Sequence, residues 1–273
     1  MIKLGIRAHD IGKMSASDLA SNVLAFGFDG VQLVFKKALD EEVDFKDVDF
    51  IKNAFVKPNI MMLGAYFNPY HPDSEELLKG VSYFKKHLEI ARSLNTFYVG
   101  TETGSYQGSP WSYHPKNHTD EALFKVSRII KELQDYADKY NAHVVIEGAY
   151  AHVAYSPDRL LEMLNMIDNP NVKVTVDLFN YLNIDNYEER NEIFERSLEL
   201  FKNRLVIFHL KDFIVVDHRL VQVGLGQGLM DYPYLIKRIK ETYPNTYLIF
   251  EGVTGDDIIT SYDLINQLLR KDV

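Results

Sequence analysis

The stretch Val144-Val-Ile-Glu147 is an apolar, β-branched run that ends in a carboxylate, and its pattern returns at Val174-Thr-Val-Asp177, Val206-Ile-Phe-His209 and Leu248-Ile-Phe-Glu251. Short apolar runs of this kind are typical of buried strands. Their last residues are 30, 32 and 42 positions apart, which is the length of one strand–helix unit, the last with a longer loop. The four runs therefore predict consecutive parallel strands, each ending in a potential metal ligand.

The same alternation of apolar runs and amphipathic segments extends toward the N-terminus. Ser15, Asp73 and Ser156 precede three of the amphipathic segments and are expected N-caps of helices. Eight strand–helix pairs in about 250 residues are the size of a (β/α)8 barrel, so we expect an α/β TIM barrel, with a single domain over residues 1–273. The eight expected strands span residues 2–6, 30–35, 60–66, 96–100, 142–147, 172–177, 205–209 and 247–251.

A doubly wound open sheet is the alternative architecture. It would carry a dinucleotide-binding fingerprint directly after the first strand. The glycine-rich segment Gly224-Leu-Gly-Gln-Gly228 lies far down the chain and is too short to be GxGxxG. The sequence therefore favours the barrel.

Composition and charge limit the functions that the chain can have. It has no cysteine, and 39 Asp plus Glu outnumber 30 Lys plus Arg, which gives a formal net charge of -9. This charge repels phosphate backbones and anionic bilayers, and the chain lacks the roughly 18 uninterrupted apolar residues of a membrane span. We expect a cytoplasmic protein that binds neither nucleic acid nor membranes. The sequence leaves open whether the chain forms a homo-oligomer.

A barrel of this kind carries its chemistry at the C-terminal ends of the strands. Glu147, Asp177, His209 and Glu251 would all enter one mouth there. Three carboxylates cannot stay ionised together in a partly buried space without a cation, because each desolvated charge is costly. We therefore expect one divalent metal ion, with Mn2+ favoured over Mg2+, Co2+ or Zn2+. The alternative is that each residue is an ordinary strand-end group bonded to loop amides.

Further polar residues at the same end are candidates for substrate binding. Arg7 ends the first strand and would clamp a phosphate or carboxylate, or pair with a surplus carboxylate of the site. Lys211 would reach a substrate oxygen or form a salt bridge between loops. Glu102 and His71 lie on loops where they would bond substrate hydroxyls, with turn-capping the alternative for His71.

Aromatic residues mark the loop after the fourth strand. Trp111, with Tyr106 and Tyr113, lies in residues 104–113. These side chains suit a loop that covers the substrate and excludes water, or one that contacts another subunit. The other histidines are expected to be surface or packing residues: His87, His118, His143, His152 and His218.

Together, these motifs resemble those of the xylose-isomerase-like TIM barrel superfamily, which includes sugar isomerases and epimerases and the AP endonuclease family 2. The resemblance covers essentially the whole chain, and the order and spacing of the motifs fit. The residues that carry it are Gly27-Phe-Asp-Gly-Val-Gln-Leu33, Asn68-Pro-Tyr-His-Pro-Asp73, Ile146-Glu-Gly148, Val176-Asp177, Phe208-His-Leu-Lys-Asp212, Val223-Gly-Leu-Gly-Gln-Gly228 before Asp231-Tyr-Pro, and Phe250-Glu-Gly252.

The resemblance implies that Glu147, Asp177, His209 and Glu251 are the metal ligands and that the two glutamates form a proton-transfer pair. The implied activity is that of a metal-dependent isomerase or epimerase acting on a sugar, keto-sugar or sugar derivative. Removing a proton next to a carbonyl makes an enediolate, whose negative oxygen a divalent ion stabilises, and two carboxylates can remove and return the proton. The alternatives are an AP endonuclease-like hydrolase, a polyol dehydratase or lyase of the same superfamily, and a non-enzymatic sugar-binding barrel.

Two positions depart from the family pattern. Gln32 stands where many relatives have Glu, and it would hydrogen-bond the substrate without adding charge. Asn180 stands where many epimerases have His, which changes one substrate contact. Relatives with a three-metal cluster use further histidines, and this chain lacks them at the fourth strand and at Asn180. One metal is therefore expected rather than three.

Overall fold

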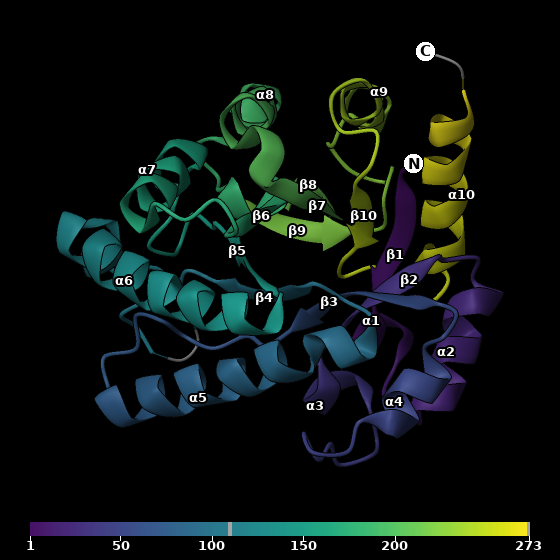
Figure 1. Ribbon diagram of the computed structural model, residues 1–273. Coiled ribbons are helices and arrows are strands. Elements are labelled where there is room, and N and C mark those ends of the chain that lie inside the picture. Colours follow the sequence, from purple (N-terminus) through teal and green to yellow (C-terminus); the bar gives the residue numbers. More distant parts are fainter. Residues whose placement is uncertain (109–110, 272–273) are drawn as a thin grey trace.

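Eight parallel strands close into a barrel with helices around its outside (Figure 1). The computed structural model describes residues 1–108 and 111–271. The strands follow the order β1-β10-β7-β6-β5-β4-β3-β2, which closes on itself, and the (β/α)8 barrel expected from the sequence is confirmed. The barrel strands are β1 (Lys3–Arg7), β2 (Gly30–Leu33), β3 (Asn59–Gly64), β4 (Tyr98–Glu102), β5 (His143–Glu147), β6 (Lys173–Asp177), β7 (Leu205–Leu210) and β10 (Tyr247–Phe250).

The helices cover the barrel with their apolar faces, and three of them begin at the expected caps. The side chains of Ser15, Asp73 and Ser156 each accept a backbone amide of the first helical turn. No helix within the described residues is both long and apolar enough to cross a bilayer. The α-helices are α1 (Ala8–Ile11), α2 (Ala16–Ala25), α3 (Phe35–Ala38), α4 (Asp49–Ala54), α5 (Ser74–Ala91), α6 (Asp120–Ala137), α7 (Pro157–Ile167), α8 (Arg190–Phe201), α9 (Tyr232–Thr242) and α10 (Asp257–Arg270).

Three strands begin or end at residues that differ from the expected ones by two positions: β4, β2 and β3, which ends at Gly64 rather than at residue 66. β4 starts at Tyr98 rather than at residue 96, because Asn95 has a left-handed φ of 56° and Thr96 Oγ1 donates to a carbonyl of β3. The turn therefore occupies these residues, and Glu102 becomes the last residue of β4. β2 ends at Leu33, because a short helix begins two residues later.

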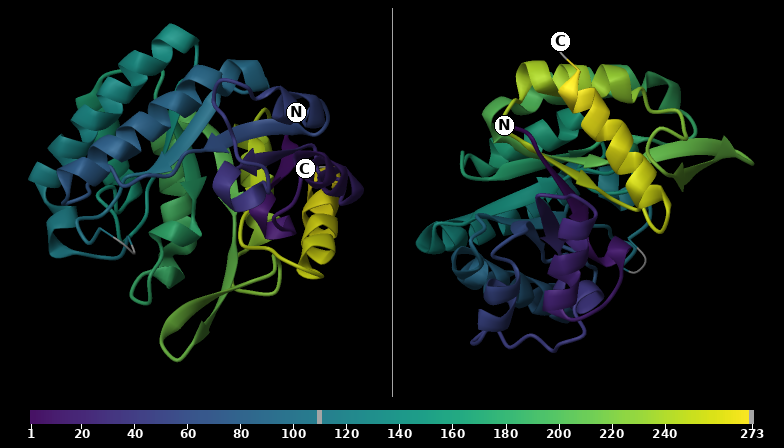
Figure 2. Two further views of the ribbon diagram at one scale, coloured as in Figure 1. Left: turned by 90° about the horizontal axis from the view of Figure 1, so that it is seen from below. Right: turned by 90° about the vertical axis from the view of Figure 1, so that its right-hand side faces the viewer.

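A hairpin that the sequence reading missed projects from the barrel between β7 and α9 (Figure 2). Its strands β8 (Asp212–Val216) and β9 (Arg219–Val223) pair antiparallel around a turn in which Asp217 and His218 both have positive φ. The sequence predicts one long loop in this region. The valines of the hairpin, with Ile214 and Leu220, carry a strand signal, but this short apolar run lies between two longer motifs.

The glycine-rich segment binds a carboxylate at the base of the hairpin. The Asp212 carboxylate accepts the backbone amides of Gly226, Gly228 and Met230, at 2.8, 3.1 and 3.0 Å. Backbone amides that converge in this way form an anion-binding concavity, and here a carboxylate of the same chain fills it. The amides of this segment thus stabilise the hairpin base through Asp212 and do not form a free phosphate-binding loop.

The inside of the barrel is filled by a small apolar cluster that includes Met61 and Met62 of β3. Neighbouring strands supply glycine where the methionines need room. A Cβ on Gly100 would lie 2.5 Å from Met62 Sδ, whereas a Cβ on Gly30 would lie 2.5 Å from the Asn59 carbonyl oxygen. A thioether can move to another rotamer, but a carbonyl of a paired strand cannot move without disturbing the ladder.

These contacts predict different costs for two alanine substitutions. Gly30→Ala should lower the free energy of unfolding by about 2–3 kcal/mol, since the strand pair itself must shift, and Gly100→Ala should cost about 1 kcal/mol or less. Urea denaturation of both variants measures the difference. Equal losses would mean that the two glycines face equally rigid surroundings.

Candidate metal centre and active site

The ends of β5, β6, β7 and β10 bring together the four residues expected to bind a metal. Glu147 and Asp177 are the last residues of their strands, His209 is next to last in β7, and Glu251 directly follows β10. All four are buried. Ligand atoms of Glu147, Asp177 and His209 lie within 4.8 Å of one another. Glu251 lies outside this set of three, but its Oε2 is 3.0 Å from His209 Nδ1.

The imidazole of His209 faces carboxylates on one side and a neutral amide on the other. Its Nδ1 lies 3.3 Å from Glu147 Oε2, 3.8 Å from Asp177 Oδ2 and 3.0 Å from Glu251 Oε2. Its Nε2 lies 2.6 Å from Gln32 Oε1. The Gln32 amide nitrogen donates to the Tyr66 hydroxyl. The amide oxygen of Gln32 is therefore the atom that faces His209, and because this oxygen accepts, His209 Nε2 carries the hydrogen.

This tautomer leaves the lone pair of Nδ1 pointing at three carboxylates, which is repulsive unless a cation lies between them. His209 Nδ1 is a buried atom without a hydrogen-bond partner among the described residues. A proton can take the cation's place: burial opposes the charged ring, but Glu147 and Glu251 outweigh it and raise the pKa of His209 to about 10. The donor set, oxygen-rich with one oriented imidazole, fits a divalent metal ion.

Two basic residues balance the remaining carboxylate charge. Lys211 Nζ lies 2.8 Å from Asp177 Oδ2 and 2.7 Å from Glu251 Oε1. Arg7 Nη1 also lies 2.7 Å from Glu251 Oε1, and the rest of its guanidinium pairs with Asp10. Burial opposes ionisation of Glu251, but Lys211, His209 and Arg7 hold the pKa of its carboxyl well below the usual range. Both basic residues thus form the ion pairs that the sequence analysis gave as the alternatives to substrate contacts.

Asn180 connects the two sides of this network. Its Nδ2 donates to Glu147 Oε1 at 2.6 Å, and its Oδ1 accepts from Lys211 Nζ at 3.1 Å. The amide therefore positions a carboxylate and an ammonium at once.

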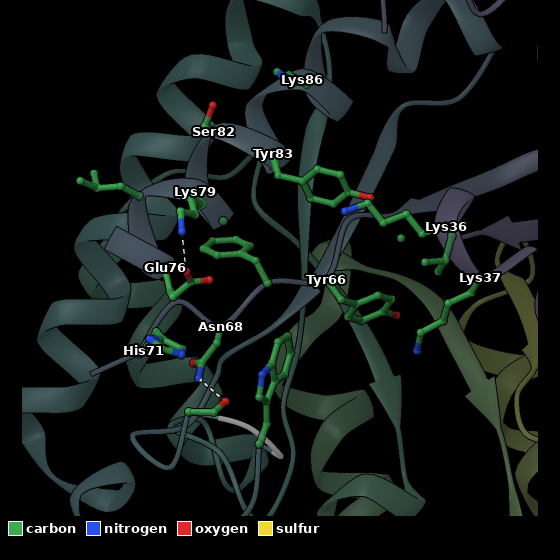
Figure 3. A pocket seen from close by; sticks show the side chains of 17 residues that line it. Lys36, Lys37, Tyr66, Asn68, His71, Glu76, Lys79, Ser82, Tyr83 and Lys86 are labelled. Atoms are coloured by element: carbon green, nitrogen blue, oxygen red, sulfur yellow. Dashed lines mark hydrogen bonds and ion pairs between the residues drawn. The ribbon is translucent and has the colours of Figure 1, made fainter. Parts of the chain in front are cut away.

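Gln32 and His71 lie where their own chain occupies their polar atoms. Gln32 is fully buried and uses both ends of its amide, the oxygen on His209 and the nitrogen on the Tyr66 hydroxyl, 2.7 Å away. Gln32 thus lies behind the imidazole of His209 and fixes its orientation. His71 Nδ1 accepts the Asp73 amide at 3.1 Å, which is the turn-capping alternative, although the side chain also borders a groove (Figure 3).

Glu102 has a neighbour that the sequence reading assigned to the surface or to packing. His152 is buried, and its Nδ1 lies 3.5 Å from Glu102 Oε2, while its Nε2 lies 3.0 Å from the Trp111 carbonyl. His152 is therefore a buried packing residue, one of the two expected alternatives, and it packs beside Glu102. The contact joins the end of β4 to the loop after β5, and these segments are far apart in sequence, so no local pattern could have revealed it.

Glu102 and His152 line a pocket of about 330 Å3 that also includes Trp111 and Asn180. Burial raises the pKa of Glu102 to about 8, and the charge of Glu147, its partner in strand register, adds to the effect. The pocket thus borders the carboxylate cluster with a side chain that holds a proton near neutrality. Ser109 and Pro110, part of the covering loop expected from the sequence, lie outside the described residues.

Comparison with known proteins identifies one family. A family model described as xylose isomerase-like TIM barrel matches residues 20–268. Similar solved structures include a D-tagatose 3-epimerase-like protein, at 17% identity and a TM-score of 0.76, with 98% of this chain and 97% of that chain covered. A xylose isomerase-like TIM barrel protein from Mycobacterium smegmatis in complex with magnesium follows at 16% and 0.73, with 98% and 96% covered. The probable 3-DHS dehydratase AsbF from Bacillus anthracis has 15% identity and a TM-score of 0.73, with 99% and 100% covered.

The raised pKa of Glu102 predicts a pH-dependent stability. Between its ordinary pKa and about 8, the folded protein holds a proton that the unfolded chain has released, so the free energy of unfolding falls as the pH rises through this window. Glu102→Gln removes the effect. In the presence of a chelator, the variant should gain roughly 2–4 kcal/mol relative to the wild type between about pH 5 and about pH 9.

Urea denaturation at several pH values measures this gain. Glu188→Gln, at an exposed position, is the control and should run parallel to the wild type. A constant difference between Glu102→Gln and the wild type across the range would show that Glu102 ionises normally.

Proposed function

Because the chain belongs to the xylose isomerase-like TIM barrel family, we propose that it is a metal-dependent isomerase or epimerase of a sugar, keto-sugar or sugar derivative. One observation carries the proposal: three buried carboxylates converge on the bare nitrogen of His209, at 3.3, 3.8 and 3.0 Å. The similarity to a D-tagatose 3-epimerase-like structure supports a small carbohydrate as the substrate class.

The residues that would hold the metal are Glu147, Asp177, His209 and Glu251. Three carboxylates and one imidazole are ligands suited to Mn2+, which we propose as the ion. When bound, it would supply a Lewis acid that stabilises the negative oxygen of an enediolate. Gln32 would keep the imidazole in the tautomer that ligation requires, since its oxygen accepts from His209 Nε2.

Glu147 and Glu251 would move the proton. Each turns one oxygen to His209 and has the other held by a fixed donor: Asn180 for Glu147, and Lys211 with Arg7 for Glu251. These donors fix the planes of the two carboxylates, which keeps them oriented for proton transfer. Lys211, His209 and Arg7 hold the pKa of Glu251 below its usual range, which makes this carboxylate a weak base. We therefore assign the first proton abstraction to Glu147.

The endonuclease alternative is less well supported. The chain carries a formal net charge of -9, which opposes binding to a phosphate backbone. A dehydratase differs from an epimerase only in the last step, where the enediolate expels a β-hydroxyl instead of regaining its proton. The similarity to a probable dehydratase keeps that outcome as the second candidate.

Metal binding is the first test. At a Mn2+ concentration of about 100 times its Kd, the wild-type protein should gain about 2.7 kcal/mol of stability, because the ion binds only the folded state. His209→Ala should abolish this gain. His143→Ala, at the opposite end of its strand, is the matched control and should keep it. Thermal denaturation with and without Mn2+, together with metal analysis, measures the effect, and an unchanged gain in His209→Ala would remove His209 from the ligand set.

Proton transfer is the second test. Glu147→Gln and Glu251→Gln should each retain metal but lose turnover by roughly 100- to 10,000-fold, because an amide cannot accept the substrate proton. In D2O the wild-type product should carry solvent deuterium on the carbon next to the carbonyl. Mass spectrometry over a panel of ketoses measures this exchange, with Glu188→Gln as control. Product formed without solvent deuterium would contradict the two-base assignment.

A further inference from the structure

A groove of about 960 Å3 opens beside the barrel mouth (Figure 3). Its walls come from the segment after β2, the loop after β3, residues 76–86 of α5 and the loop after β4. Among its described lining residues are four lysines and a single acidic residue, Glu76. In a chain with a net charge of -9, a basic groove is a local reversal of charge. The lysines are Lys36, Lys37, Lys79 and Lys86.

Three of these lysines, Lys36, Lys37 and Lys86, have no acidic partner within 4.0 Å among the described residues. Glu76 is committed to Lys79, whose Nζ lies 2.6 Å from its Oε1. Lys36 and Lys37 are exposed, and among the described residues neither has a carboxylate oxygen within 4.0 Å. Lys36 Nζ lies 5.0 Å from the ring centroid of Tyr83, which favours the ammonium without neutralising it. The groove therefore keeps a net positive charge on the wall formed by α3.

The groove adjoins the metal centre through two aromatic residues. Tyr66 lines the groove, and its hydroxyl accepts from Gln32, which in turn contacts His209. Trp111 lines both the groove and the inner pocket that contains Glu102. A molecule whose reacting carbons lie in the inner pocket can therefore extend past Trp111 into the groove.

The charges of the two regions determine which end of such a molecule lies in the inner pocket and which lies in the groove. Among its described lining residues, the inner pocket has no lysine or arginine that could pair with an anionic group. The wall with Lys36 and Lys37 attracts one. We propose that the substrate carries an oxyanion, a phosphate ester or a carboxylate, at the end remote from its reacting carbons, and that Lys36 and Lys37 bind it. The inference rests on the proposed function for the reaction, but binding of the anion can be tested without turnover.

Trp111 provides the measurement, because it is the only tryptophan of the chain and lines the groove. The probes are D-fructose 6-phosphate, D-fructuronate and D-fructose, titrated into the Mn2+-loaded protein while its tryptophan fluorescence is followed, with calorimetry as a second measure. The wild type should bind at least one anionic probe about tenfold more tightly than D-fructose. Stronger binding of the phosphate ester identifies a phosphate site, and stronger binding of the uronate identifies a carboxylate site.

The double substitution Lys36→Ala/Lys37→Ala should bring the affinity for the anionic probe to within about twofold of that for D-fructose, whose binding should not change. The matched control is Lys52→Ala/Lys139→Ala, which removes the same charge elsewhere: Lys52 is exposed on α4, and Lys139 Nζ lies 5.3 Å from the ring centroid of Tyr136. The control should behave as the wild type. Equal affinity of the wild type and the Lys36→Ala/Lys37→Ala variant for both anions, or no binding of either anion by both methods, overturns the anion site.

Deuterium exchange from D2O, measured on the same probes, separates this inference from the proposed function. Exchange in the wild type without any effect of the two lysines rejects the anion site and leaves the isomerase intact. Loss of anion binding in the lysine variant, with no exchange in the wild type on these or other ketoses, upholds the anion site and rejects the isomerase.

Discussion

Charge held out of water is the constraint on which the rest of this molecule depends. Glu147, Asp177 and Glu251 end three strands of one barrel and meet at a buried imidazole. Each buried carboxylate would be costly alone, so the surroundings are built to balance them: Lys211 and Arg7 supply fixed positive charge, and the remaining space suits a divalent ion. The barrel places these carboxylates close together. Because they repel one another, positively charged residues surround them.

The strands and their polar ends could be predicted because both depend on residues that are close together in the sequence. An apolar run that ends at Glu147 or Asp177 predicts both the position of a strand and the carboxylate at its C-terminal end. The contacts of Gln32 and His152 could not be predicted in this way, since each depends on a partner more than 40 residues away that only the closed barrel brings near. Gln32 could be located at a strand end, but its orientation behind an imidazole, rather than toward a substrate, follows from three-dimensional packing.

The glycine-rich segment shows how one signal can have two physical meanings. Clustered backbone amides attract an anion whether it belongs to a ligand or to the protein. Here Asp212, one residue after Lys211, occupies them. That arrangement fixes the backbone from which Lys211 extends to Asp177 and Glu251. A motif that suggests phosphate binding thus serves the carboxylate centre, and the basic groove lies on another part of the mouth.

The projecting hairpin has a fixed base and a free tip. At the base, Asp212 is held by loop amides, and Gln222 Nε2 donates to the Glu251 carbonyl at 2.5 Å. At the tip, Asp217 and His218 form an exposed turn at the end of a two-stranded ribbon. Chain inserted at such a turn has few native contacts to break. The tip is therefore a place where evolution or an engineer could insert an additional module, whereas a change of length at the base would be transmitted to the backbone of Glu251.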